Sequence, residues 1–260
     1  MFFSVLGSGS RGNSVYIEAG RTAILIDNGF SGKELIARLQ AIGKDVEGLD
    51  AIFVTHEHND HIGGVGVLSR RCRIPVYANE GTFRGGDGRL KGLFQRSEFE
   101  TGDTIAFQDL EVRSFRVSHD TSDPVGYVID TGRVRLGYCT DTGKVSHLMR
   151  QRLQNCHGLI LEFNHDLQML AQGPYPLALQ QRVKSNQGHL ANPDAAALLR
   201  DLLHNGLSQI VLAHLSEVNN RPELAMQQAR SVVAPDSGTG IVLAEQYHPT
   251  GLFSLGRSAG

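Results

Sequence analysis

Three histidines and one aspartate fall within a single run of six residues, and this run narrows the range of folds and sites more than any other feature. His56-Glu57-His58-Asn59-Asp60-His61 begins at the end of the segment AIFVTH at 51–56, which we expect to form a buried strand. A loop at the end of such a strand can turn alternate side chains toward one point. We therefore predict that His56 and His58 face one metal ion and that Asp60 and His61 face a second. Imidazole nitrogens and carboxylate oxygens suit Zn²⁺, and also Mn²⁺ or Fe.

Four ligand-type side chains do not complete the coordination of two metal ions, so further ligands are expected elsewhere. His119, Asp141 and His214 each end a β-rich segment: 110–119, 134–141 and 209–214 respectively. Loops at strand ends are where binding residues gather. Taken singly, each of the three is more typical of a polar strand cap. Taken as a set, they fill the missing positions, and we predict that they complete the site.

The remaining pattern alternates strands and helices in two halves, each with strands first. Expected strands lie at 2–6, 14–19, 22–27, 51–56, 75–78, 104–107, 110–119, 124–130, 134–141, 158–163, 209–214 and 240–247, and expected helices at 31–42, 61–71, 146–155, 194–204 and 222–233. This order predicts an α/β protein, an αββα four-layer sandwich of two mixed sheets flanked by helices. We expect one domain over residues 1–260, with about the last eight residues loosely held.

Composition excludes several classes of protein. The chain has 260 residues, 25 Lys and Arg against 27 Asp and Glu, and no run of 18 apolar residues, so no membrane span is expected. The first six residues lack a basic region and a cleavage site, so we expect no signal peptide. The three cysteines form no C-x-x-C pair and are odd in number, which indicates a reducing cytoplasm.

Local charge departs from this near-neutral balance between residues 69 and 96. Seven basic residues lie there against two acidic ones: Arg70, Arg71, Arg73, Arg84, Arg89, Lys91 and Arg96 against Glu80 and Asp87. A stripe of this kind can track a phosphate backbone, although an ordinary solvated surface fits equally well. Arg84, Arg89 and Lys91 are the candidate nucleic-acid contacts.

Gly7, Gly9 and Gly12 match the G-x-G-x-x-G pattern of dinucleotide-binding proteins. That pattern needs a helix to follow it, because the helix N-terminus holds the pyrophosphate. Here the alternating segment NSVYIEA follows and predicts a second strand. We therefore expect a tight strand-turn-strand loop whose amides could meet an anionic substrate. Ser10 and Asn13 of this loop are candidate phosphate contacts.

Several segments of the sequence together carry a family resemblance. The H-x-H-x-D-H run together with LIDNG (25–29), VSHD (117–120), CTDTG (139–143) and AHLS (213–216) resembles the metallo-β-lactamase fold superfamily. SGSRGNS (8–14), FNHD (163–166), GHLAN (188–192) and AHLSEVNN (213–220) are similar to the YycJ/WalJ-type hydrolases of bacteria. The resemblance implies a binuclear site: one ion on His56, His58 and His119, the other on Asp60, His61 and His214, with Asp141 bridging. It also implies Asp60 as a catalytic residue.

This resemblance implies a metal-dependent phosphodiesterase, and more narrowly a nuclease that acts on DNA ends as a 5′-3′ exonuclease. Two cations about 3.5 Å apart make hydroxide available at neutral pH to attack phosphorus. His189 in GHLAN is the candidate proton donor, because it is similar to a histidine of tRNase Z-like phosphodiesterases. His165 is a candidate phosphate contact, although a structural turn fits equally well. We expect Asp27 to hydrogen-bond to the ligand-bearing loops without binding metal.

Two other functions remain open at this stage. A thioesterase or lactonase could use the same metal site on a small acyl substrate. A degenerate site in a protein-binding module is the alternative without catalysis, and the seven ligand-competent residues argue against it. The sequence leaves open DNA or RNA as substrate, the mode of cleavage, the metal and the oligomeric state.

Overall fold

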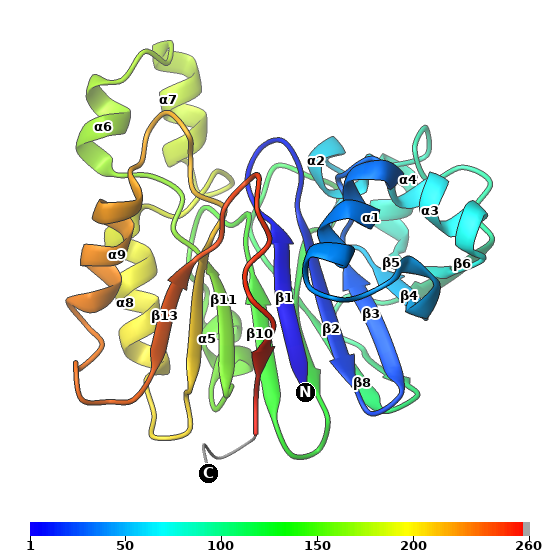
Figure 1. The fold of residues 1–260 in the computed structure, drawn as a ribbon. Coiled ribbons are helices and arrows are strands. Elements are labelled where there is room, and N and C mark those ends of the chain that lie inside the picture. Colours follow the sequence, from blue (N-terminus) through cyan, green and yellow to red (C-terminus); the bar gives the residue numbers. More distant parts are fainter. Residues whose placement is uncertain (257–260) are drawn as a thin grey trace.

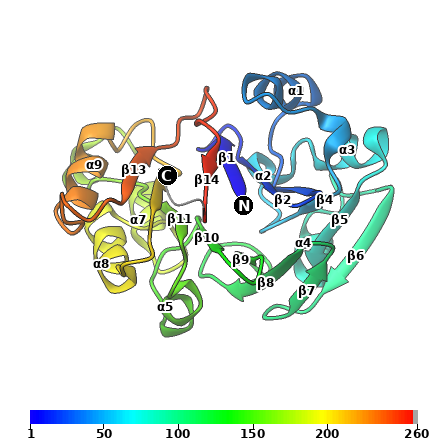
Figure 2. The same cartoon turned by 60° about the horizontal axis from the view of Figure 1, so that its bottom comes forward.

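Two seven-stranded β-sheets pack face to face in the computed structural model, which describes residues 1–256. Helices cover the outer face of each sheet (Figure 1). Seen from the other direction, α1 and α3 lie outside one sheet, and α5, α8 and α9 lie outside the other (Figure 2). The predicted αββα sandwich of two mixed sheets is confirmed.

The first sheet has the strand order β14-β1-β2-β3-β4-β5-β6. Its strands are β1 (Phe2–Gly7), β2 (Ser14–Ala19), β3 (Thr22–Ile26), β4 (Ala51–Phe53), β5 (Pro75–Asn79), β6 (Gln95–Phe99) and β14 (Phe253–Ser254). The helices of this half are α1 (Gly32–Ala41), the 3₁₀ turn Val46–Gly48, α2 (Asn59–Ile62), α3 (Val65–Cys72) and α4 (Glu80–Gly85). Strands β14 to β3 pair antiparallel, and β3 to β6 pair parallel.

The second sheet repeats this plan with the order β13-β12-β11-β10-β9-β8-β7. Its strands are β7 (Thr104–Phe107), β8 (Leu110–Arg116), β9 (Val125–Asp130), β10 (Arg135–Cys139), β11 (Gly158–Glu162), β12 (Gln209–Ala213) and β13 (Gly240–Leu243). The helices of this half are α5 (His147–Leu153), α6 (Leu167–Gln172), α7 (Leu177–Lys184), α8 (Asn192–Leu202) and α9 (Pro222–Arg230). Strands β7 to β10 pair antiparallel, and β10 to β13 pair parallel.

The alternation of strand side chains builds three apolar layers. In β3, Ile24 and Ile26 face the other sheet, whereas Leu25 packs outward with Leu35 and Leu39 of α1. Strand β12 divides its side chains between the inter-sheet core and the α8–α9 layer in the same way. Because both faces of each sheet are covered, the central strands are apolar throughout, and polar groups are left to the strand ends.

The structure differs from the expected elements at several places. The expected helix at 61–71 is divided into α2 and α3 by Gly63 and Gly64. A side chain at Gly64 would lie 1.9 Å from the carbonyl oxygen of Phe30, so this close approach requires glycine. Helices α4, α6 and α7 and strands β6 and β14 were not expected; they are short, and β6 is largely exposed. The loop at 7–14 joins β1 to β2, as predicted.

Strand β14 lies at the edge of the first sheet. Among the residues expected to be loosely held, Phe253 and Ser254 pair with β1, while residues 257–260 lie outside the described residues. All three cysteines are free thiols. In the described part of the chain, no helix has the length and apolar character needed to cross a bilayer.

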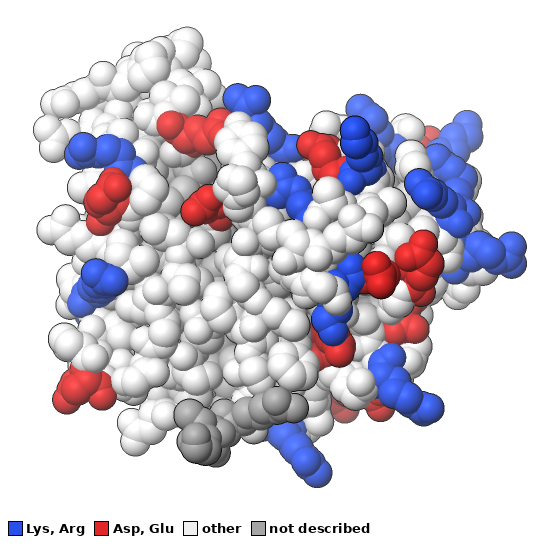
Figure 3. Space-filling model, in the orientation of Figure 1, with Lys and Arg blue, Asp and Glu red and all other residues white. Residues whose placement is uncertain are grey.

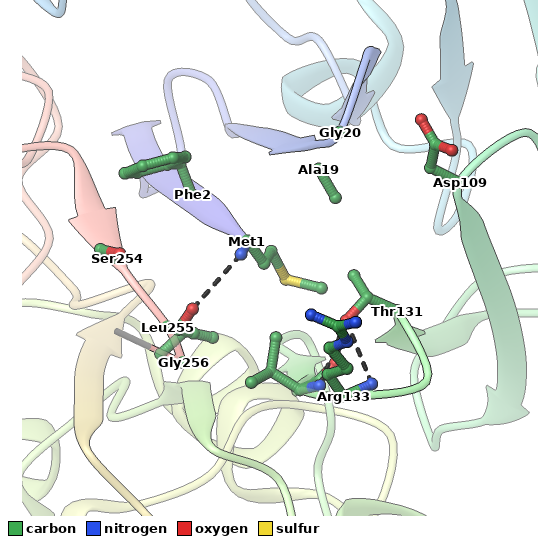
Figure 4. A pocket seen from close by; sticks show the side chains of 11 residues that line it. Met1, Phe2, Ala19, Gly20, Asp109, Thr131, Arg133, Ser254, Leu255 and Gly256 are labelled. Carbon is green, nitrogen blue, oxygen red and sulfur yellow. Dashed lines mark hydrogen bonds between the residues drawn. The ribbon is translucent and has the colours of Figure 1, made fainter. Parts of the chain in front are cut away.

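A hollow of about 400 Å³ opens where the chain start and β14 meet (Figure 4). The Met1 amino group donates to the carbonyl oxygen of Leu255, and Arg133 and Asp109 are charged residues of the lining. No histidine or cysteine lines this hollow among the described residues. It lies at the opposite end of the strands from the histidine-rich loops.

Candidate metal centre

The predicted ligands converge at one end of the sandwich, where strands from both sheets end. The loop after β4 carries His56 to His61, and the loops after β8, β10 and β12 carry His119, Asp141 and His214. The first sheet supplies four of these seven residues and the second sheet three. The structure thus brings together all seven residues that the sequence singled out, from positions 158 residues apart along the chain.

The seven residues form two triads. The ligand atoms of His56, His58 and His119 lie within 4.8 Å of one another, as do those of Asp60, His61 and His214. Asp141 lies between the two triads. Its oxygens are 3.4 Å from His61 Nε2, 3.4 Å from His214 Nε2 and 3.8 Å from His119 Nε2. One carboxylate is therefore within reach of two neighbouring ion positions.

Oxygen atoms hold the Nδ1 atoms of four of the histidines. His61 Nδ1 lies 2.8 Å from Asp27 Oδ2, and His214 Nδ1 lies 3.2 Å from Glu162 Oε1. His119 Nδ1 lies 3.1 Å from two carbonyl oxygens, those of residues 187 and 188. His56 Nδ1 lies 2.9 Å from Thr55 Oγ1, whose proton goes to Asp27. Since these oxygens accept, Nδ1 carries the proton when each ring is neutral, and Nε2 is then the atom available to bind a metal.

Three site residues have left-handed backbone conformations. Asp27, Asp141 and His214 have φ angles of 58°, 56° and 55°, and each follows the end of a strand. For residues other than glycine this conformation costs about 1–3 kcal/mol. The surrounding hydrogen bonds hold it in place, and it turns each side chain from the line of its strand toward the cluster.

Charge in the cluster is unevenly shared among the histidines. Burial and the neighbouring rings lower the pKa of His56 well below its usual range. Burial would also lower the pKa of His61, but three surrounding carboxylates raise it to about 9. Burial is likewise outweighed at His214, where Asp141 is the main group that raises the pKa. In the metal-free protein, the protons on His61 and His214 therefore supply the positive charge at this centre.

The residues present fit a divalent metal centre. Among the described residues, His56 Nε2, His214 Nε2 and Asp141 Oδ2 are buried without a hydrogen-bond partner. Buried polar atoms are normally satisfied, so three such atoms in one cluster call for a shared partner. Imidazole nitrogens and carboxylate oxygens form the donor set that Zn²⁺, Mn²⁺ and Fe accept.

Glu162 is a site residue that the sequence analysis missed. It ends β11 and is fully buried, and its Oε1 lies 2.8 Å from His189 Nδ1 and 3.2 Å from His214 Nδ1. Its Oε2 accepts from the backbone N–H groups of Thr142 and Leu190. Burial would raise the pKa of Glu162, but the two histidines lower it, so the carboxylate is ionised. An acidic residue at the end of the apolar run GLIL was the signal that could have identified it.

The Asn13 side chain contacts two of the predicted ligands and does not face substrate. It is buried, and its Nδ2 lies 3.1 Å from Asp60 Oδ2 and 3.0 Å from His61 Nε2. The predicted role of the loop amides in anion binding is wrong for five of them. The N–H groups of residues 8, 9, 11, 12 and 13 all donate within the protein. Ser10, in contrast, is exposed and lines a hollow beside His189 and His214.

His165 does not reach the surface, so the predicted phosphate contact is wrong. Its side chain is 1% exposed, and its Nδ1 lies 3.3 Å from Asn164 Oδ1. Burial lowers the pKa of His165 to about 4, so the ring is neutral at pH 7 and brings no positive charge. Its backbone accepts a hydrogen bond from Asn192, which fixes the start of α8 beside the site.

The segment that carries the three basic residues proposed from sequence packs against Glu57 of the loop at 56–61 and against α3. Gly85 packs against Glu57, and Gly66 of α3 packs against the backbone of Arg89. Arg84, Arg89 and Lys91 are exposed, and Arg84 makes only a 3.8 Å surface ion pair with Glu80. Figure 3 shows Lys and Arg gathered at the edge of the molecule that carries α1, α3 and α4.

The fold and the converging ligands together define a metal-dependent hydrolase of the metallo-β-lactamase type. Residues 22–215 match the family described as the β-lactamase superfamily domain. The chain belongs to this superfamily, and within it to the YycJ/WalJ-type proteins.

Named relatives support the narrower assignment. The chain is 39% identical to exodeoxyribonuclease YycJ of Bacillus anthracis over 252 residues, which covers 96% of the chain and 95% of the relative. It is 41% identical to exodeoxyribonuclease WalJ of Streptococcus pneumoniae over 244 residues, covering 92% and 91%. Among solved structures, the metallo-β-lactamase fold protein YhfI of Bacillus subtilis has a TM-score of 0.74 at 16% identity. The alignment covers 96% of this chain and 98% of that one, and it bears on the fold alone.

Metal uptake should release protons. The carboxylates around His61 raise its pKa to about 9, so the metal-free ring is charged at about pH 7.5, whereas a ligating ring must be neutral. Titration with Zn²⁺ or Mn²⁺ should displace at least about one proton per chain. Calorimetry in two buffers of different ionisation enthalpy measures this number, and uptake without proton release would contradict the electrostatics described above.

The same charge affects stability without metal. Because the folded pKa of His61 exceeds its ordinary value, the stabilisation is complete below about pH 6.5 and is lost as the pH rises through about 9. The metal-free protein should therefore lose thermal stability over this range, and the His61→Gln variant should lose less.

Proposed function

We propose that this chain is a DNA nuclease that hydrolyses phosphodiester bonds at strand ends. His56, His58 and His119 would hold one divalent ion, Asp60, His61 and His214 would hold a second, and Asp141 is within reach of both positions. The observation that carries this proposal is the carboxylate of Asp141 lying within 3.8 Å of histidines from both triads. The relatives named as exodeoxyribonucleases support DNA as the substrate.

Two bound divalent ions, Zn²⁺ or else Mn²⁺ or Fe, would polarise phosphoryl oxygens and lower the pKa of water. The leaving oxygen needs a proton, and His189 is the residue placed to donate it. Glu162 accepts from His189 Nδ1, so Nε2 is the atom free to give up a proton. The His189 side chain is about one fifth exposed and lines hollows on both sides of the cluster.

A thioesterase or lactonase of a small acyl substrate would use the same ions. The two hollows at His189 are small, about 140 and 180 Å³, below the volumes typical of pockets that enclose a small molecule. The basic residues beside the loop at 56–61 also have no role in acyl hydrolysis. Both features support the nuclease.

A substrate panel tests the proposed function. Metal-loaded protein should shorten end-labelled DNA oligonucleotides and should hydrolyse bis(p-nitrophenyl) phosphate faster than S-lactoylglutathione. Parallel RNA oligonucleotides, and labels at either end, report the sugar and the direction of cleavage. Faster thioester turnover, or no shortening of DNA with either Mn²⁺ or Zn²⁺, would overturn the proposal.

Replacing His189 should separate proton donation from metal binding. His189→Ala should keep its metal and lose about 10²–10³-fold in kcat on DNA. The loss should be much smaller on bis(p-nitrophenyl) phosphate, because p-nitrophenolate leaves without a proton. Glu162→Gln should lose about 10–100-fold in activity together with metal affinity, since it holds His214 as well. His147→Ala, at an exposed position on α5, is the matched control. Equal losses on both substrates would contradict the donor role.

The basic residues should set the salt dependence of DNA binding. Replacing Arg84, Arg89 and Lys91 with Ala should reduce the slope of log affinity against log salt by about two on single strands, given about 0.7 per phosphate contact. A control variant replaces Arg21, Arg133 and Arg230, three exposed basic residues elsewhere on the surface. Fluorescence anisotropy over a range of KCl concentrations measures both slopes, and an equal change in the two variants would show a general charge effect.

A further inference from the structure

A helical hairpin projects beyond the sheets directly beside the metal centre. It consists of α6 and α7, which lie between β11 and α8 along the chain (Figure 1). The connection between its helices is Gly173-Pro174-Tyr175-Pro176. Residues 167–181 include no charged side chain, in a chain with 52 Lys, Arg, Asp and Glu residues. Because this surface carries no charged side chain, it does not pair with the phosphates of an anionic substrate.

The base of this hairpin is fixed to the cluster. Ser118 Oγ donates to the carbonyl oxygen of Asn186 at 2.6 Å, and the carbonyl oxygens of residues 187 and 188 hold His119 Nδ1. Arg182 of α7 forms an ion pair of 2.6 Å with Asp120, the residue after His119. The hairpin is therefore a built part of the rim of the site, held at several points.

Tyr175 of the hairpin lines both hollows that open on the metal centre. One hollow, of about 140 Å³, also has Ser10, His189 and His214 in its lining. The other, of about 180 Å³, also has His119, Asp120 and His189. Tyr175, Val183 and His189 are common to the two. The tyrosine thus lies where a chain would pass on either side of the candidate proton donor.

The ring of Tyr175 has no partner within the described residues. It is half-buried, stacks on no other ring, and its hydroxyl group makes no hydrogen bond. Its neighbours Pro174 and Pro176 restrict the backbone, since proline fixes its own φ and limits the residue before it. The backbone that carries the ring is therefore restricted before a ligand arrives, which lowers the entropy cost of ordering this connection on binding.

We propose that Tyr175 stacks on the nucleobase next to the cleaved phosphate. This inference rests on the proposed nuclease function. Aromatic rings bind bases of any sequence by stacking, and this is the usual mode of single-strand recognition.

Abasic substrates provide the test. Metal-loaded wild-type protein is compared with Tyr175→Ala, Tyr175→Phe and Leu177→Ala on single-stranded oligonucleotides whose terminal nucleotide is either normal or a tetrahydrofuran abasic analogue. Tyr175→Ala should raise KM for the normal end by about tenfold and leave KM for the abasic end unchanged. Tyr175→Phe, which keeps the ring, and Leu177→Ala, at a site 69% exposed on α7, should match wild type.

The outcomes separate this inference from the function on which it rests. If wild-type protein cleaves DNA but Tyr175→Ala affects normal and abasic ends equally, the stacking role is wrong and the nuclease stands. If wild-type protein cleaves no DNA, the proposed function itself fails.

Discussion

The site depends on hydrogen bonds that the ligating histidines make away from the metal positions. An oxygen atom holds Nδ1 of His56, His61, His119 and His214, so the Nε2 atom of each ring is directed to the common centre. These oxygens belong to buried or backbone groups that have their own partners: Asp27 also accepts from Thr55, and Glu162 from two backbone amides. The ring orientations are therefore determined by the protein itself and exist before an ion binds.

Backbone conformation also orients the side chains of the site. Asp27, Asp141 and His214 leave their strands in the left-handed region, where Asp and His are among the better-tolerated residues. The cost, about 1–3 kcal/mol at each position, is offset by the apolar layers that hold the strands in register on both sides. A large core thus permits strained backbone at the strand ends that carry the site.

Sequence predicted the local part of the site better than the long-range part. The run at 56–61 identifies itself, because its ligands are adjacent and follow an apolar strand. His119, Asp141 and His214 could be proposed only as strand ends that complete the metal coordination. Glu162 was missed because one buried carboxylate in an apolar segment has no periodic signal, and its partners are 27 and 52 residues away. His165 was misjudged for the converse reason: burial removes it from solvent, and burial depends on the packing of distant segments. The short helices of the α6–α7 hairpin likewise lacked an apolar face to reveal them.

Each triad combines ligands from both sheets, so neither half of the fold can form the site alone. Each triad takes two residues from the loop after β4 in the first sheet and one from the second sheet, and the shared carboxylate comes from the second. An isolated N-terminal half would keep the dense histidine run yet could complete neither coordination sphere. Any ion it captured would be loosely held and open to solvent. Hydrolytic competence is thus a property of the closed sandwich, and a nascent chain acquires it only when β12 has joined its sheet.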